Sequence, residues 1–397
     1  MFAIYMFVVR LLFNVHVLVR NLNYNLLSYI WCVSYCTNCV NCGWCKNDVN
    51  FFSASKSRNR IMLRSLSNRA VCGLRCATRQ YSQASVVCAD AGNDGGFKNV
   101  GVIGLGLMGH GVAQVAAMAG YNVVGIEMQQ GALDTGMKRI ESSLGKMVAR
   151  NVSKGVYDQA KGDQEYKDIM SRITASTDIK SVKDCDLIIE AIAENMDLKL
   201  GFYKNLAAVV TNKDCVFASN TSSLQITAMA NASLRPELFV GLHFFNPVQL
   251  MKLVEVIRTE KTTDETVQRM NAFSKKIGKS PVSCGDTPGF IVNRLLVPFL
   301  AQALDLANRG NASVVDIDVS MQLGAGHPMG PLHLADYIGL DTIHSILVGW
   351  QKDFPEEKAF LLPKNLVDKV TAGHFGRKSG QGFYHWDGEK RLGPVDV

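Results

Sequence analysis

Short apolar runs alternate with amphipathic stretches between residues 98 and 257. The runs rich in β-branched residues, which predict strands, are 98–104, 121–127, 186–192, 215–220, 239–244 and 252–257. Apolar residues at helical spacing lie between them, at 107–120, about 131–170 and about 197–210. Strands that alternate with helices in this way predict an α/β fold with a mainly parallel sheet.

The pattern changes near residues 285–290, where the strand-like runs stop. The helical segments beyond this point are 290–310, 312–324 and those near 339–351 and 362–372. The first of these is long and amphipathic and is closed by Gly310. We therefore expect an α/β domain over residues 98–287 and an all-α C-terminal domain over residues 288–397.

The first predicted strand ends in a glycine-rich turn, GLGLMG, that matches the G-x-G-x-x-G dinucleotide-binding fingerprint. Its glycines are Gly104, Gly106 and Gly109, and its other residues are Leu105, Leu107 and Met108. The motif alone is a weak signal, but here a helix follows it and Glu127 ends the next strand. A carboxylate at Glu127 accepts hydrogen bonds from both ribose hydroxyls and repels a 2′-phosphate. The pattern therefore favours a Rossmann-type domain that binds NAD rather than NADP, and the alternative is a glycine-rich turn without a ligand.

Polar side chains gather at the ends of the later predicted strands. They are Glu190, Glu194, the run 219–223, His243, Asn246 and Glu255. Ligands of an open parallel sheet bind outside the carboxyl ends of its strands, so these residues are candidates for one site. The separation of His243 and Glu255 allows a strand, a turn and a return strand to bring them together as a general base with its carboxylate partner. The alternative is a structural histidine and a glutamate on an exposed strand face.

The net charge of +7 belongs to the N-terminal part of the chain. Residues 1–97 hold ten basic and three acidic residues, whereas residues 98–397 hold 32 of each. We therefore expect no nucleic-acid partner, and the lack of an uncharged apolar stretch of 18 residues argues against stable membrane insertion. Cys185, Cys215 and Cys284 are widely spaced, which indicates a reducing compartment and buried small side chains rather than a disulfide framework. We expect no metal site.

Residues 1–97 are interpreted as an N-terminal leader. From Met62 the chain is rich in Arg and Ser and has no acidic residue before Asp90, which is typical of a mitochondrial transit peptide. The alternative is a disordered basic tail. Because Met62 offers a second start, residues 1–61 are interpreted as an upstream extension of the gene model. Five cysteines from Cys32 to Cys45 have spacings that zinc or an iron–sulfur cluster uses, but they fit neither standard pattern, so a fortuitous cluster is favoured.

Six motifs in the chain together carry a resemblance to a known family. They are GVIGLGLMG (101–109), ASNTSSLQIT (218–227), GLHFFNPVQLMKLVEVI (241–257), DTPGFIVNRLL (286–296), LGAGHPMGPL (323–332) and FGRKSGQGFYHW (375–386). In this order they resemble the short-chain L-3-hydroxyacyl-CoA dehydrogenase family, over about residues 98–386. The resemblance implies NAD-dependent, reversible oxidation of L-3-hydroxyacyl-CoA to 3-oxoacyl-CoA. It also implies a helical dimerisation domain, a homodimer, an acyl-CoA substrate between the domains and, for the mitochondrial members, fatty-acid β-oxidation in the mitochondrial matrix.

The resemblance also assigns roles to single residues. His243 would be the catalytic base and Glu255 its orienting partner. Ser222 and Asn293 would contact the 3-oxygen of the substrate.

Further residues would contact the cofactor or the CoA group. The cofactor contacts besides the fingerprint and Glu127 would be Glu194, Lys199, Ser222, Asn246 and Lys378. Ser143 and Arg150 would contact CoA, and Arg150 stands where the family often has Lys, which keeps the positive charge.

Three other interpretations stay open. A related dehydrogenase could act on a hydroxy acid without CoA, although Ser143, Arg150 and the TSS run argue against it. A scaffold protein could keep the fold without catalysis, although every catalytic position is present. A metal-binding N-terminal module could also be fused to the enzyme.

Overall fold

The computed structural model describes residues 94–395, which belong to one compact unit that spans Asp90–Val397. The predictions for the transit-like segment after Met62 and for the cysteines from Cys32 to Cys45 lie outside the described residues. Within residues 94–395, no helix is both long and apolar enough to cross a bilayer.

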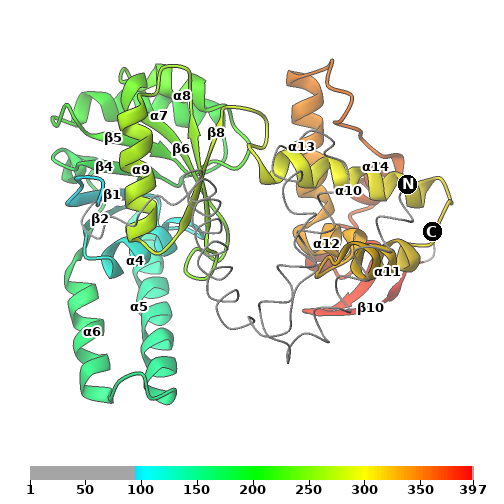
Figure 1. Cartoon of the computed structure of the whole chain (residues 1–397), viewed down its shortest axis with the longest axis horizontal. Coiled ribbons are helices and arrows are strands. Elements are labelled where there is room, and N and C mark those ends of the chain that lie inside the picture. The colour runs from blue at the N-terminus through cyan, green and yellow to red at the C-terminus, as the bar shows by residue number, and fades with distance from the viewer. Residues whose placement is uncertain (1–93, 396–397) are drawn as a thin grey trace, which may run out of the picture. The chain divides into compact units, whose positions relative to one another are not determined.

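An eight-stranded sheet forms the centre of the α/β region, which we define as residues 94–285 (Figure 1). Its strands are β1 (Asn99–Ile103), β2 (Asn122–Ile126), β3 (Ile173–Ser176), β4 (Leu187–Glu190), β5 (Val216–Ser219), β6 (Phe239–Phe244), β7 (Leu253–Arg258) and β8 (Ser280–Gly285). The spatial order is β3-β2-β1-β4-β5-β6-β7-β8, and all neighbours pair in parallel except β6 and β7. The predicted mainly parallel sheet is confirmed, although β3 and β8 were not predicted.

The central strands are apolar throughout because both faces of the sheet are covered. Every residue of β4, β5 and β6 is buried, as expected for parallel strands between two helical layers. Successive side chains alternate between the faces, so that Ile188 and Ile189 belong to two different apolar cores. The order reverses between β1 and β4, which is the place where open α/β sheets bind their ligands.

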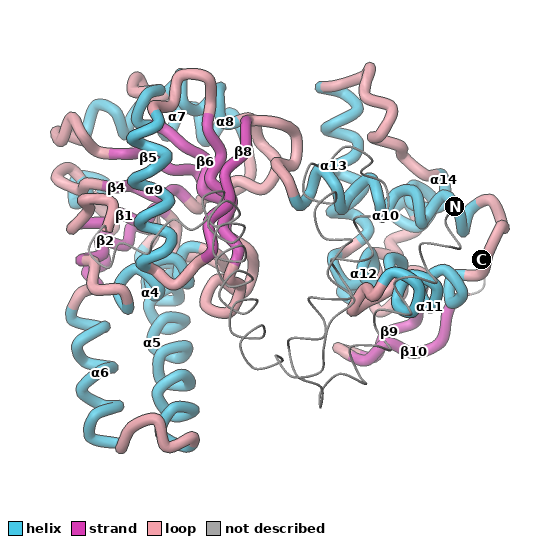
Figure 2. Tube along the Cα trace, viewed as in Figure 1, coloured by secondary structure: helices cyan, strands magenta, loops and turns pink. Residues whose placement is uncertain are grey.

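The helices of the α/β region follow the predicted spacing with one break. They are α4 (Gly109–Met118), α5 (Gln130–Ser153), α6 (Gln159–Ser171), α7 (Met196–Val209), α8 (Ile226–Ala232) and α9 (Asp264–Lys276), with short 3₁₀ turns η2 (Ile179–Val182) and η3 (Pro236–Leu238). The stretch predicted as one helix over about 131–170 is two helices, which lie side by side (Figure 2). Gly155 has a positive φ of 67°, and the Asp158 side chain caps α6 by accepting a hydrogen bond from the amide of Lys161. Helices α8 and α9 were not predicted.

The helical region, defined here as residues 292–394, packs around its own apolar core. Its helices are α10 (Val292–Asn308), α11 (Val314–Ala325), α12 (Pro331–Ile338), α13 (Leu340–Asp353) and α14 (Lys364–Thr371), with the 3₁₀ turn η4 (Arg377–Ser379). The predicted helical character is confirmed, but the region also contains an antiparallel hairpin of β9 (Tyr384–Asp387) and β10 (Lys390–Pro394), which the expectation of an all-α domain missed.

A buried carboxylate explains why a hairpin forms here. Asp336 on α12 is fully buried and accepts hydrogen bonds from the amides of Phe383 and Tyr384, both 2.9 Å long, and from Nε1 of Trp386 at 3.0 Å. The start of β9 is therefore fixed by a side chain 48 residues earlier in the sequence.

Candidate active site

The fingerprint turn between β1 and α4 has the close backbone approach that its glycines allow. Gly104 has a φ of 88°, and a Cβ at this position would lie 2.7 Å from the carbonyl oxygen of Ala191. A Cβ on Gly109 would lie 1.7 Å from the carbonyl oxygen of Gly104. A Cβ on Gly106 would meet no atom within 4 Å, so this side of the turn is open to a ligand. The turn therefore has the shape of a phosphate cradle at a helix start.

Two further groups fix this turn. The Leu105 side chain is fully buried, and it fills the space that Gly125 and Gly136 leave, since a Cβ on either glycine would approach it to 2.9 or 2.5 Å. The Leu105 amide donates a 2.7 Å hydrogen bond to Oε1 of Glu127 at the end of β2. The Glu127 carboxylate thus lies against the turn.

His243 and Glu255 face each other across the antiparallel pair β6–β7. They are directly opposite in the strand register, and His243 Nδ1 lies 2.6 Å from Glu255 Oε2. Oε1 of Glu255 accepts the amides of Ile291 at 3.1 Å and Val292 at 2.9 Å. Burial by itself raises the pKa of this carboxyl, but the hydrogen bonds from His243 and the two amides outweigh it and hold the Glu255 pKa below its usual value. The pair is therefore an imidazole with an ionised partner.

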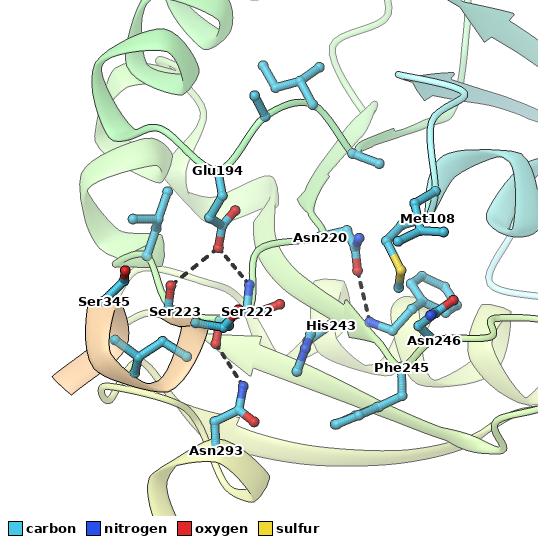
Figure 3. Close-up of a pocket in the computed structure, with 18 of the residues that line it drawn as sticks. Met108, Glu194, Asn220, Ser222, Ser223, His243, Phe245, Asn246, Asn293 and Ser345 are labelled. Carbon is cyan, nitrogen blue, oxygen red and sulfur yellow. Dashed lines mark hydrogen bonds between the residues drawn. The ribbon is translucent and has the colours of Figure 1, made fainter. Parts of the chain in front are cut away.

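A cavity of about 880 Å³ joins the fingerprint turn to His243 (Figure 3). Its lining residues are Leu107, Met108, 191–194, Asn220, 222–224, 243–246, Asn293, Asp341, Thr342, Ser345 and Ile346. Most of these residues follow strands β4, β5 and β6, so the cavity lies at the carboxyl ends of the parallel strands.

Ser222 and Asn293 come together beside His243 in this cavity (Figure 3). Nδ2 of Asn293, on the first turn of α10, donates a 3.3 Å hydrogen bond to the carbonyl oxygen of Ser222. On the other side, Oδ1 of Asn220 accepts the Phe244 amide at 2.9 Å and fixes the end of β6 next to Asn246. The cavity therefore places a hydroxyl, two amides and an imidazole around one space.

Glu194 is tied to the serine run by its carboxylate. Oε1 accepts hydrogen bonds from Oγ1 of Thr221 at 2.6 Å and from the Ser222 amide at 2.9 Å. Its Oε2 lies 3.3 Å from Nζ of Lys199. The sequence did not indicate Thr221 individually, although it lies in the polar run 219–223.

Lys199 and Glu190 lie beneath the cavity rather than on its rim. Both are fully buried, and Lys199 Nζ lies 2.6 Å from Oε1 of Glu190. Oε2 of Glu190 accepts hydrogen bonds from Ser219 Oγ at 2.7 Å and from the Tyr203 hydroxyl at 3.2 Å. The sequence grouped Glu190 with the ligand-binding rim, but Glu190 is fully buried and does not line the cavity. Its Oε1 accepts the amide of the lining residue Ile192 at 2.8 Å, and Lys199 connects it to Glu194. Burial, together with the negative charge of Glu190, raises the pKa of Tyr203.

Helix α13 contributes a further wall that the sequence did not indicate. Asp341, Thr342 and Ser345 line the cavity, and Lys378 Nζ lies 2.6 Å from Oδ2 of Asp341. Lys378 itself is not a lining residue, so the structure connects it to the cavity through Asp341.

A second cavity, of about 560 Å³, lies along α5. It is lined by His110, Thr135, Lys138, Arg139, Ser142, Ser143 and Lys146. Ser143 belongs to this set, whereas Arg150 lies farther along the same helix and is exposed. The sequence missed Lys138, Arg139 and Lys146, although the i, i+4, i+8 spacing of Lys138, Ser142 and Lys146 on a helix places them on one face.

The three cysteines of residues 94–395 are free thiols. Cys185 and Cys215 are buried, as the sequence predicts, and burial raises their pKa to about 12. Cys284 is half-buried rather than buried as predicted, and its partial burial raises its pKa to about 11. These thiols stay protonated near neutral pH, so they are poor nucleophiles.

Comparisons with known proteins agree with this geometry. Residues 99–287 match the family model of the 3-hydroxyacyl-CoA dehydrogenase NAD binding domain, and residues 289–386 match that of the 3-hydroxyacyl-CoA dehydrogenase C-terminal domain. The chain is 48% identical over 291 residues to the mitochondrial hydroxyacyl-coenzyme A dehydrogenase of Sus scrofa, which covers 73% of this chain and 91% of that protein. The corresponding protein of Homo sapiens is 48% identical over 290 residues, with the same coverage.

A solved structure gives the same result for the fold. The (S)-3-hydroxybutyryl-CoA dehydrogenase PaaH1 of Ralstonia eutropha superposes with a TM-score of 0.68 at 38% identity, covering 73% of this chain and 99% of that one. Because the two family models together match nearly all of residues 99–386, the chain belongs to the NAD-binding 3-hydroxyacyl-CoA dehydrogenase family.

Proposed function

We propose that this protein oxidises L-3-hydroxyacyl-CoA reversibly to 3-oxoacyl-CoA with NAD, and that His243 is the general base. The observation that carries the proposal is the His243–Glu255 pair, with its 2.6 Å contact, in the cavity that reaches the fingerprint turn. A base with an ionised partner next to a dinucleotide site suits the removal of a hydroxyl proton as hydride leaves the same carbon.

The residues present fit NAD. The glycine turn has room for a pyrophosphate at Gly106, and Glu127 offers a carboxylate to the ribose hydroxyls. Glu194, Asn246 and Met108 line the cavity beyond the turn, where the nicotinamide end would lie. When it is bound, NAD supplies the hydride acceptor. Lys199 and Lys378 would act on that end through Glu194 and Asp341, to which they are bound.

The proton moves through His243. Its Nδ1 is held by Glu255, which leaves Nε2 as the ring atom that takes the proton of the substrate hydroxyl. The ionised Glu255 stabilises the imidazolium that results. In the reverse direction, the imidazolium returns this proton to the oxygen at C3.

Ser222 and Asn293 hold the oxygen at C3. Both line the cavity beside His243, and the Ser222 hydroxyl and the Asn293 amide are donors that can face a developing negative charge. Fixed donors of this kind orient the hydroxyl toward the base and stabilise the alkoxide.

The second cavity on α5 would hold the phosphates of CoA. Lys138, Arg139 and Lys146 supply positive charge there, and Ser143 supplies a hydroxyl. Arg150 extends the positive charge along the same helix. The proposal therefore favours a CoA ester over a free hydroxy acid.

The wider organisation is also part of the proposal. Residues 98–287 would form the NAD-binding domain and residues 288–397 the dimerisation domain of a homodimer. The exposed Val315, Val319 and Leu323 form an i, i+4, i+8 stripe on α11 that a second copy would cover. The mitochondrial relatives and the transit-like composition after Met62 support the mitochondrial matrix and fatty-acid β-oxidation.

The test is an absorbance assay of NADH consumption with acetoacetyl-CoA, run beside NADPH and beside free acetoacetate. We expect turnover with NADH and acetoacetyl-CoA. Turnover should be much lower when NADPH replaces NADH or when free acetoacetate replaces the CoA ester. Equal rates with free acetoacetate would favour the dehydrogenase that acts without CoA. NADH binding without turnover of either substrate would favour the non-catalytic scaffold.

A further inference from the structure

The turn that leads into α10 has an unusual backbone. Gly289 and Phe290 adopt successive positive φ angles, 76° and 56°. Glycine adopts this conformation freely, but it is disfavoured for a bulky residue with a Cβ. Phe290 is nevertheless 3% exposed, so its surroundings hold it in the left-handed conformation.

This strained residue lies beside His243 and directly precedes the backbone donors to Glu255. The amides that follow it, those of Ile291 and Val292, are the two backbone donors to Oε1 of Glu255. Its ring centroid lies 5.7 Å from that of His243. The dihedral angles of Phe290 set the direction of the next amide, and its side chain packs beside the imidazole.

We propose that Phe290 is a positioning residue for His243 and Glu255: its left-handed backbone aims the amides of Ile291 and Val292 at the Glu255 carboxylate, and its buried ring limits the movement of the imidazole. The inference rests on the proposed function, since it requires His243 to be the general base. The first turn of α10 is thereby part of the machinery that keeps Glu255 ionised.

Loss of this alignment has a predictable effect on proton affinity. The two amides stabilise the carboxylate, so weakening them makes the His243–Glu255 pair bind a proton more tightly. Hydroxyacyl-CoA oxidation requires neutral His243. If the pair binds its proton more tightly, His243 becomes protonated at a higher pH, and the acidic limb of the pH–activity profile moves to higher pH. A merely structural role for Phe290 would lower stability without moving this acidic limb.

The test compares Phe290→Gly with a matched control, Leu234→Gly. Leu234 has a φ of 59° like Phe290, but it is 80% exposed and does not line the cavity. Glycine tolerates positive φ at both sites without holding the backbone there. We expect Phe290→Gly to lower kcat by about 10- to 100-fold and to shift the acidic limb of kcat/KM up by about one pH unit. Leu234→Gly should change neither.

A milder variant separates the ring from the backbone. Phe290→Leu keeps the Cβ and an apolar side chain, so we expect a kcat a few-fold lower with an unshifted limb. Wild-type kcat and an unmoved limb in Phe290→Gly overturn the inference. If that variant does not fold, wild-type kcat in Phe290→Leu overturns it. A limb shift in Phe290→Leu as large as in Phe290→Gly overturns the backbone role.

The same assays separate this inference from the proposed function. A His243→Ala variant with wild-type kcat would overturn the general base, whatever Phe290 does. An inactive His243→Ala variant together with a normal Phe290→Gly variant would overturn the role of Phe290 alone.

Discussion

Glu255 in the α/β region and Asp336 in the helical region are both fully buried carboxylates that accept three hydrogen bonds. Their pKa values nevertheless move in opposite directions. Burial raises the pKa of Asp336, and the hydrogen bonds from the Trp386 indole and two backbone amides, which lower it, do not outweigh burial. Burial also raises the pKa of Glu255, but the hydrogen bond from His243 and those from two backbone amides together outweigh burial and lower the pKa of Glu255. The hydrogen-bond partner of a buried carboxylate, rather than its depth of burial, therefore decides whether the carboxylate is ionised and can stabilise a catalytic imidazolium.

The largest expected effect follows from removing that partner. His243→Ala should lower kcat by about 10²- to 10⁴-fold, because a positioned acid/base group contributes this much. NADH oxidation with acetoacetyl-CoA measures it, and fluorescence titration with NADH serves as the control for an intact cofactor site. A kcat within a few-fold of wild type would contradict the role of His243.

Neutralising the carboxylate should have a smaller effect on rate. Glu255→Gln keeps the shape but removes the charge that stabilises the imidazolium, so we expect kcat to fall by about 10²-fold. The steady-state assay across pH 5–9 measures this change, and the acidic limb should move to lower pH because the imidazolium loses its partner. An unchanged pH profile would argue that Glu255 is only structural.

The equivalent change in the helical region should affect stability and leave the pH profile alone. Asp336→Asn places an amide NH₂ against N–H groups that now donate hydrogen bonds to the carboxylate. A buried polar group without its hydrogen bond lowers the free energy of unfolding by about 1–3 kcal/mol. Urea unfolding measures the loss. A shifted limb of kcat/KM in this variant would mean that the two carboxylates are not separate in function.

The smallest effect concerns the pH dependence of stability, and the two carboxylates should act with opposite sign. Because the folded pKa of Glu255 is lowered, its contribution is present above its ordinary pKa of 4.5 and is lost as the pH falls below it. Because the folded pKa of Asp336 is raised, its contribution is present below 3.8 and is lost as the pH rises above it. Urea unfolding between pH 3 and 7 measures the free energy of unfolding. In Glu255→Gln this free energy should fall less than in the wild type as the pH is lowered. In Asp336→Asn it should fall less than in the wild type as the pH is raised. Parallel curves for both variants and the wild type would contradict these assignments.

The parts that local pattern determines could be predicted from the sequence. The turn 104–109, Glu127 and the β6–β7 pair follow from short runs and fixed spacings, and the register places His243 opposite Glu255 as their separation allows. The extra break in the long helical stretch was visible only as Gly155 and the Asp158 cap. Such single residues are weak signals within a polar stretch.

The parts that depend on packing could not be predicted. Nothing local shows that Lys199 turns inward to Glu190, because that depends on which face of α7 the sheet covers. The hairpin β9–β10 depends on Asp336, which lies far away in the sequence. The wall that Thr342 and Ser345 add to the cavity likewise depends on where α13 packs.

The buried Leu105 side chain has a consequence for cofactor affinity. A glycine-rich turn is usually costly to order, at roughly 1–2 kcal/mol of backbone entropy for each residue fixed. Here Leu105 anchors the middle of the turn in the space beside Gly125 and Gly136, and Glu127 holds its amide. Folding therefore orders the turn before any dinucleotide arrives, and little of the association free energy is lost to ordering it. A smaller residue at position 105 should therefore weaken NAD binding although the Leu105 side chain makes no contact with NAD, because part of the binding free energy would be spent on ordering the turn.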